Sequence, residues 1–164
     1  MISLIGMKLR PNKSVAAFTL IELFLVVLLL SVIVSLSTPM FRRTFSELSL
    51  KNTAFTISKL ANYSQEMAII DRVSYRMNLD YKNGKFWLAK FEPKENTYKK
   101  LTNMYGKVFA FPESSNASGP KDVTFNPDGR CDEAEIRITD AHGTGYAVRT
   151  QGFGRRVAVE DITK

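Results

Sequence analysis

The sequence predicts an α+β fold in which one long N-terminal helix packs on an antiparallel β-sheet or sandwich. Three observations predict it: a nearly uncharged apolar run, an apolar pattern of helical spacing that continues beyond it, and a change to period-two alternation at Val73. The 164 residues suffice for one such domain with appendages. We therefore expect a basic leader, a transmembrane helix, an amphipathic continuation of that helix and a β-rich domain, at residues 1–17, 18–41, 42–72 and 73–164.

The apolar run at 18–41 has the features of a membrane span. Its 24 residues would form a helix of roughly 36 Å, and about 30 Å of hydrocarbon needs only about 20 residues. A secretory signal has a shorter apolar core that small residues follow, whereas here the small residues come first. The charged residues before the run are all basic, and such charge stays in the cytoplasm: Lys8, Arg10 and Lys13. The remainder of this single-pass chain is expected across the membrane.

Two residues interrupt the apolar run. Glu22 is its only charge, and a carboxylate within hydrocarbon costs about 2.5–3.5 kcal/mol on insertion scales. Pro39 removes one backbone hydrogen bond and is expected to kink the helix. The alternative for Pro39 is a boundary between a membrane anchor and a separate helix.

Helical spacing continues from Phe41 to about Asp71, giving a predicted helix of some 80 Å in all. The large apolar side chains of its second half fit one stripe, which we expect to face the β domain. They are Phe41, Phe45, Leu48, Phe55, Leu60, Tyr63, Met67 and Ile70.

Short strands separated by turn residues follow from Val73 onward. Asn83-Gly84, between two alternating runs, predicts a hairpin with a type I′ turn. Further strands are expected in KVFAFP, DVTFNPDG, AEIRITDAHGTG, YAVRTQGFG and RRVAVED. The polar segment 112–121 is expected to be a surface loop. Such strand spacing is typical of an antiparallel assembly covered by a helix.

The residues offer little for catalysis. His142 is the only histidine and lies in a turn-like segment, while Cys131 is the only cysteine and has no evident partner base. Acidic residues at Asp122, Asp128, Asp132, Glu133, Glu135 and Asp140 are interpreted as solvated turn carboxylates, with a metal site as the weaker alternative. The sequence therefore argues against an enzyme, a metal site and a bound cofactor. A membrane-anchored periplasmic enzyme stays an alternative from another functional class.

The net charge of +7 includes three basic residues of the leader. Arg149 and Arg156 alternate with apolar neighbours, as outward-facing strand residues do, and Lys99, Lys100, Arg155 and Lys164 add further positive charge. Without an aromatic-basic RNA motif, nucleic-acid binding is the less favoured interpretation.

The segment KSVAAFTLIEL, with the apolar run after it, resembles the processing site of type IV prepilins and type II secretion pseudopilins. Ala17 stands where that family usually has Gly, and Pro39 falls where the family tends to place a proline. The resemblance implies that a prepilin peptidase cuts between Ala17 and Phe18 and methylates the new amine of Phe18. It also implies that Glu22 pairs with that amine, within or between subunits, and so sets register in a filament. The alternative for Glu22 is a position near the membrane interface, from which its side chain reaches water.

The C-terminal segment is similar to that of H-type (GspH/FimT) minor pseudopilins and their minor-pilin relatives. The similarity rests on a Phe-x-Pro-x-Gly turn, an Asp-x-x-Gly turn and a closing Gly-Arg strand, at Phe125, Pro127, Gly129, Asp140, Gly143, Gly154, Arg155 and Val157. It implies a minor pseudopilin of a type II secretion system, in the bacterial inner membrane with its C-terminal domain periplasmic. The implied partners are other pseudopilins, the prepilin peptidase and an inner-membrane assembly platform. A minor pilin of a type IV pilus, for adhesion, motility or DNA uptake, is the alternative.

Overall fold

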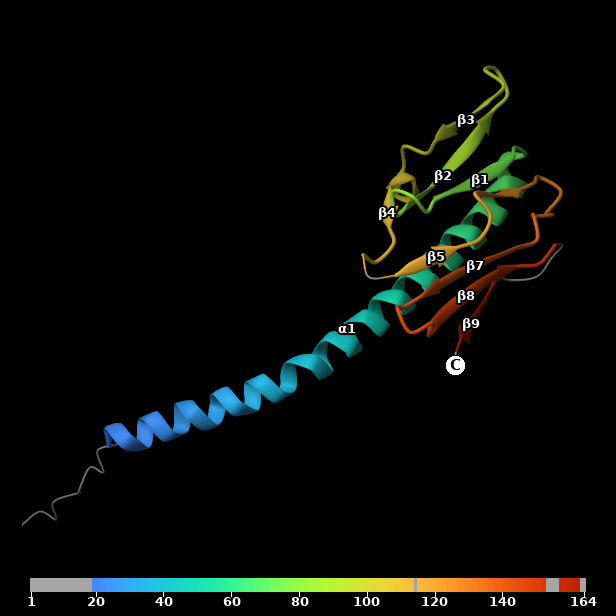
Figure 1. Cartoon of the computed structure of the whole chain (residues 1–164). Helices are drawn as coiled ribbons and strands as arrows, with labels where there is room; N and C mark the ends of the chain where they lie inside the picture. The colour runs from blue at the N-terminus through green and yellow to red at the C-terminus, as the bar shows by residue number, and fades with distance from the viewer. Residues whose placement is uncertain (1–18, 114, 153–156, 163–164) are drawn as a thin grey trace, which may run out of the picture. The chain divides into compact units, whose positions relative to one another are not determined.

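The computed structural model describes residues 19–113, 115–152 and 157–162, with the side chains of 36–44 left out (Figure 1). The chain divides into two compact units, Met1–Met40 and Phe41–Lys164. Each is described by itself below.

Helix α1 is the only α-helix in the described part of the chain and spans Leu20–Asp71. Helical backbone includes Pro39, and the helix ends where Arg72 adopts a left-handed conformation with φ 55°. This conformation is unfavourable for a residue with a Cβ, but it terminates helices readily. Asp71 in the last turn accepts hydrogen bonds from the Tyr75 hydroxyl at 2.6 Å and from Lys90 Nζ at 2.7 Å. These contacts fasten the end of α1 to the first two strands.

Two antiparallel sheets make up the rest of the second unit, and they pack on its part of α1 (Figure 1). The first has the order β3-β2-β1-β6, with β4 also pairing β2; the second has the order β5-β7-β8-β9. The first sheet contains β1 (Tyr75–Asp80), β2 (Lys85–Glu92), β3 (Thr97–Lys100), β4 (Phe109–Ala110) and β6 (Asp122–Phe125), and a short 3-10 helix, η1 (Met104–Gly106), precedes β4. The second contains β5 (Asn116–Ser118), β7 (Ala134–Thr139), β8 (Gly145–Thr150) and β9 (Ala158–Ile162). The predicted α+β fold, a long helix packed on antiparallel sheets, is confirmed.

The predicted β1–β2 hairpin is present, but its predicted turn type is wrong. The register pairs Asp80 with Lys85, which leaves four residues in the loop, and only Gly84 of these has a positive φ, 62°. Asn83 instead donates from its backbone N–H and its side-chain amide to the two oxygens of Asp80. A side chain that bonds the backbone three residues along offers an alternative to a two-residue turn, so the Asn-Gly pair closes a longer loop.

Segment 112–121 was predicted to be a surface loop, and this is wrong for its centre. Asn116–Ser118 forms β5, which pairs with β7 at the edge of the second sheet. The flanking Asn116 and Ser118 are exposed, while Ala117 between them packs against the core. An edge strand needs backbone pairing on one side only, so a polar sequence with one apolar residue suffices.

The predicted apolar stripe of α1 is wrong in four of its eight members. Leu60 is buried, and Tyr63 and Met67 pack against the core. The other members with described side chains are exposed, namely Phe45, Leu48, Phe55 and Ile70. The buried face carries smaller side chains at helical spacing instead: Leu50, Ala54, Ile57, Ser58, Leu60, Ala61, Ser64 and Ala68. Small side chains let a helix pack close to a sheet. The buried positions of α1 are therefore those where little space remains between the backbones, and large side chains do not fit there.

One core unites the three parts of the second unit. Ile57 of α1, Phe86 of the first sheet and Ile138 of the second belong to the same buried cluster. The turns that join the strands behave as predicted at Gly129 and Gly143, whose φ angles of 80° and 83° require the freedom of glycine.

Candidate assembly segment in helix α1

The predicted site residues lie at the start of α1. Thr19 precedes the first helical residue, and its backbone oxygen and Oγ1 accept hydrogen bonds from the Glu22 N–H at 3.1 and 3.3 Å. A threonine followed three residues later by glutamate is the pattern of a capping box, in which the first side chain satisfies a free N–H of the helix. Glu22 therefore occupies the first turn, where the helix dipole also favours a negative charge.

Two of the predicted site residues, Ala17 and Phe18, lie outside the described residues. The predicted cleavage, the methylation of Phe18 and its pairing with Glu22 therefore stay predictions. Pro39 is helical in its backbone, and the predicted kink there stays a prediction as well.

The first part of α1 is apolar on every side and exposed. All residues from Thr19 to Ser35 are exposed, and the exposed fraction reaches 86% at Leu20 and 69% at Ile21. Glu22 is the only charged residue among them. A helix that is apolar all round is typical of one buried in a large assembly or in a membrane.

The predicted span 18–41 lies partly outside the described residues, because residue 18 and the side chains of 36–41 are among those left out. Within the portion that is described, no helix combines the length and the apolarity needed to cross a membrane.

A second apolar surface follows on α1 within the unit Phe41–Lys164. The exposed fractions are 67% at Phe45, 50% at Leu48, 46% at Phe55 and 69% at Ile70. We call these four residues, with Ile69, the exposed stripe. It shares the helix with the exposed charges of Lys51, Lys59 and Glu66. Large apolar side chains gathered on one solvent-facing helix surface are a common mark of a protein-protein contact.

The residues considered for catalysis occupy structural positions. Cys131 is half-buried, and its thiol donates to the carbonyl of Gly152 at 3.4 Å. Burial, followed by the charges of Asp132 and Glu133, raises the pKa of the Cys131 thiol and so disfavours the reactive thiolate. His142 is exposed in the turn between β7 and β8.

The acidic residues of the turns bond local partners in the way solvated turn carboxylates do. Asp128 accepts from the Arg130 N–H, and Asp132 accepts from the Thr124 N–H. The interpretation as a turn carboxylate is wrong for Glu135, which lies in β7 and forms ion pairs with Arg137 and Arg149.

No family model and no curated protein matches this chain. Its fold, however, is similar to two solved structures of the minor pseudopilin EpsH from the type 2 secretion system of Vibrio cholerae. One has a TM-score of 0.58 at 11% identity and covers 70% of this chain and 96% of that protein. The other has a TM-score of 0.59 at 10% identity, with coverage of 71% and 94%.

The fold is pilin-like. At such low identity the similarity concerns the architecture, namely the long helix and the antiparallel sheets that pack on it. The pilin-like resemblance predicted from the sequence is therefore confirmed in structure over most of the chain.

Proposed function

We propose that this chain is an H-type minor pseudopilin of a type II secretion system. It is processed by a prepilin peptidase and assembled with other pseudopilins into a periplasmic pseudopilus. The observation that carries the proposal is the beginning of α1, which is exposed along its length, apolar on all sides and charged only at Glu22, in a chain of pilin-like fold.

An exposed apolar helix of this kind must be buried in the cell, either in a membrane or against other protein. Burying a side chain such as Leu or Phe contributes about 1.5–3 kcal/mol, so a run of exposed ones gives a large driving force for insertion or packing. Before assembly the cover is the inner membrane, with the basic leader on the cytoplasmic side and the β domain in the periplasm. After assembly it is the helices of neighbouring subunits, and the exposed stripe extends that contact along α1.

Glu22 gives the assembly its register. Cleavage after Ala17 creates a positively charged amine on Phe18, four residues before the carboxylate. A buried charge is tolerated when it is paired, so the Glu22 carboxylate of one subunit is matched by the amine of its own or an adjacent Phe18. The partners are thus other pseudopilins, the peptidase and the assembly platform.

The work of such a subunit is mechanical, and we assign it no enzymatic activity, metal or cofactor. The thiol of Cys131 is held against the backbone of Gly152 and its raised pKa keeps it protonated. A transport role needs only folding stability and specific contact with neighbours.

Mass spectrometry of the chain isolated from producing cells tests the processing step. We expect a mature protein that starts at Phe18 and carries one additional methyl group on its amine. A protein that still begins at Met1, in cells with an active prepilin peptidase, contradicts the proposal.

Co-purification tests the assembly step. The variant Glu22→Ala is expected to insert in the membrane normally but to be lost from complexes with other pseudopilins, whereas the control Glu66→Ala is retained. Normal recovery of Glu22→Ala in those complexes refutes the register role. Loss of surface pili with intact secretion, on deletion of the gene, identifies the type IV pilus alternative instead.

A further inference from the structure

A pocket lies on the first sheet, on the face opposite to the core. In β2, Phe86 and Leu88 are buried in the core, so the alternating side chains of Lys85 and Trp87 point to the other face. With neighbouring residues they line a pocket of about 560 Å³, which is in the size range of ligand-binding pockets. All of its lining belongs to the unit Phe41–Lys164. We call this space the basic pocket.

The basic pocket exists because β2 changes partners at this point. β1 pairs with one edge of β2, and β3 and β4 follow each other along the other edge (Figure 1). β3 pairs with residues 89–92 and β4 with residues 85–86, so neither of these strands pairs with Trp87. The chain between β3 and β4 leaves the sheet as a loop that contains η1. The half-buried Trp87 therefore lies beside a gap, with the 46% exposed Val108 as an apolar wall.

The rim of the basic pocket carries positive charge without a counter-charge. Lys85 and Lys100 line it and are exposed, and neither forms an ion pair or a hydrogen bond with any residue in the described ranges. Two further exposed lysines neighbour the lining residues in the chain, namely Lys82 and Lys107. Among the described lining residues Asp80 has the one carboxylate, and both of its oxygens already accept hydrogen bonds from Asn83. The pocket therefore attracts an anionic ligand.

An aromatic ring among lysines suits two kinds of anionic polymer, a single-stranded nucleic acid and an acidic peptide. A nucleic acid stacks successive bases on several aromatic side chains. Phe109 also lines the pocket, but its ring stacks on Phe86 of the core. Tyr98, on the same face of the sheet, already has the guanidinium of Arg76 at 3.8 Å from its ring centroid. Trp87 is thus the one free platform among the described lining residues, which favours the peptide.

The arrangement of the lysines around Trp87 defines the ligand further. Lys85 precedes Trp87 by two residues, and Lys100 of β3 pairs with Ala89, two residues after Trp87. Residues two apart in a strand share one face and lie about 7 Å apart. The two lysines therefore flank the indole at similar distances along β2. An extended peptide with acidic residues at its first and fifth positions and an apolar residue at its third has the same spacing on one side.

We infer that the basic pocket binds an extended acidic segment of a partner protein. Its two carboxylates pair with Lys85 and Lys100, and its central apolar side chain packs on Trp87 and Val108. Tryptophan is among the residues that contribute most to protein-protein interfaces. The pocket and the exposed stripe lie on different elements, so neighbouring helices that cover the stripe leave the pocket open. This last point rests on the proposed function; recognition of the acidic segment does not.

Recognition is tested by fluorescence titration of the full chain in detergent. Trp87 is the only tryptophan of the chain, so its emission reports on the basic pocket directly. The probe is the acetylated and amidated peptide Glu-Ser-Leu-Ser-Glu. The control peptides are Gln-Ser-Leu-Ser-Gln, which lacks the charges, and Ser-Glu-Leu-Glu-Ser, which has the same composition but turns its carboxylates away from the leucine side.

We expect a saturable change of emission with the probe peptide. The uncharged peptide is expected to bind about tenfold more weakly, a loss that two exposed ion pairs together account for. The permuted peptide is also expected to bind more weakly than the probe. Equal binding of either control, or no change with the probe, overturns the inference.

Variants assign the binding to the basic pocket. The double variant Lys85→Gln/Lys100→Gln is expected to bind the probe about tenfold more weakly than the parent. Lys51→Gln/Lys59→Gln removes two exposed charges from α1 instead and is expected to bind it unchanged. Equal binding by the two double variants overturns the inference. A single-stranded oligothymidylate that binds more tightly than the probe and loses binding in Lys85→Gln/Lys100→Gln identifies a nucleic-acid site, which also overturns it.

The partner is tested in cells that produce the full chain with a photo-crosslinking residue in place of Thr102, which is exposed two residues after Lys100. We expect cross-links to a segment of another protein with the acidic-apolar-acidic spacing of the probe, and their loss in Lys85→Gln/Lys100→Gln but not in Lys51→Gln/Lys59→Gln. Cross-links to a segment without this spacing, or unchanged cross-links in both double variants, overturn this part. If the probe binds but the mature N-terminus is not at Phe18, the proposed function fails and the basic pocket stands.

Discussion

The face of α1 that stabilises the second unit can be tested by a matched pair of substitutions two residues apart in the helix. Ile57 is 0% exposed and lies in the core, whereas Phe55, the larger side chain, is 46% exposed. Replacing a buried Ile by Ala typically lowers the free energy of unfolding by about 2–5 kcal/mol. Full burial of a Phe contributes about 1.5–3 kcal/mol, so the half-exposed Phe55 contributes no more than about 1.5 kcal/mol.

Both substitutions end in alanine and raise helix propensity by similar small amounts, which leaves burial as the main difference between them. At about 4 °C per kcal/mol, Ile57→Ala is expected to lower the melting temperature of the full chain in detergent by roughly 8–20 °C, and Phe55→Ala by less than about 6 °C. Near-ultraviolet circular dichroism measures both transitions. If Phe55→Ala lowers the melting temperature as much as Ile57→Ala, the assignment of the buried face is refuted.

Three further predictions concern single sites. If the charge of Glu22 sets filament register, the Glu22→Gln variant is lost from pseudopilin complexes in co-purification. The control Thr19→Ala removes only the helix cap and is retained. Equal loss of both variants assigns the effect to the cap. Hydrogen bonds from Lys90 and then from Tyr75 lower the pKa of Asp71 in the folded protein. The stability that Asp71 contributes is therefore fully present above its unfolded pKa of about 3.9, and it is lost as the pH falls through the lower folded pKa. Urea unfolding between pH 6 and 2 is thus expected to show a smaller acid loss for Asp71→Asn than for the parent, and parallel curves contradict this. Arg72→Gly is expected to raise the free energy of unfolding by about 0.5–1 kcal/mol, since relief of the left-handed conformation, about 1–2 kcal/mol, exceeds the entropy that glycine loses; an unchanged or lower urea midpoint contradicts it.

The parts of the fold that the sequence predicted are those in which a local pattern decides the structure. Tyr75, Met77 and Leu79 alternate with polar residues, and β1 buries the first set as alternation requires. Gly129 and Gly143 have positive φ, a conformation that glycine adopts readily and that other residues adopt rarely. In each case, residues close together in the sequence determine the local structure.

The predictions that are wrong concern features that tertiary contacts determine, namely the buried face of α1 and the strand β5. Phe55 and Ala54 are adjacent on α1, and hydrophobicity alone favours Phe55 for the core, yet Ala54 is the one that is fully buried. Close approach of the sheets selects the small side chain, and that approach is a property of the assembled unit. For the same reason β5 was missed, since its pairing partner β7 lies about twenty residues away in the chain.

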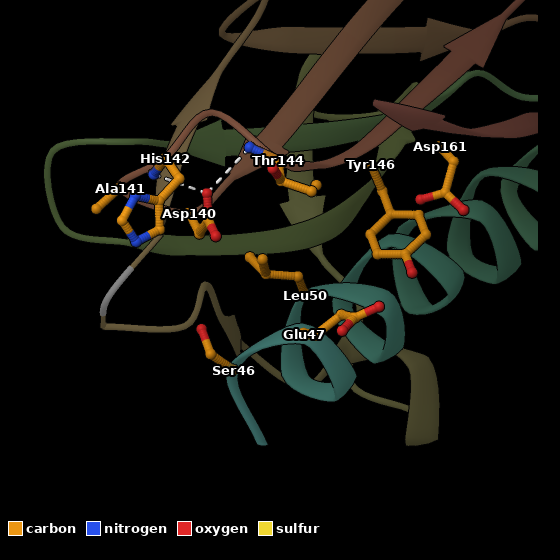
Figure 2. A pocket seen from close by; sticks show the side chains of 10 residues that line it. Ser46, Glu47, Leu50, Asp140, Ala141, His142, Thr144, Tyr146 and Asp161 are labelled. Atoms are coloured by element: carbon orange, nitrogen blue, oxygen red, sulfur yellow. Dashed lines mark hydrogen bonds between the residues drawn. The ribbon is translucent and has the colours of Figure 1, made fainter. Parts of the chain in front are cut away.

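A pocket lined by α1 and the second sheet shows the same limit (Figure 2). Glu47, Tyr146 and Asp161 come from α1, β8 and β9, and no motif links them in the sequence. The register of β8 with β9, which pairs Tyr146 with Asp161, is what brings two of the three together.

The small residues on the buried face of α1 have a consequence for how this protein can change over time. Ala54, Ala61, Ser64 and Ala68 hold the helix against the sheets, while Phe45, Leu48 and Phe55 contribute little to that attachment. The stability of the unit and the character of the outward surface of α1 therefore depend on opposite sides of one helix. Substitutions of the large outward residues can change that surface without compensating mutations in the core.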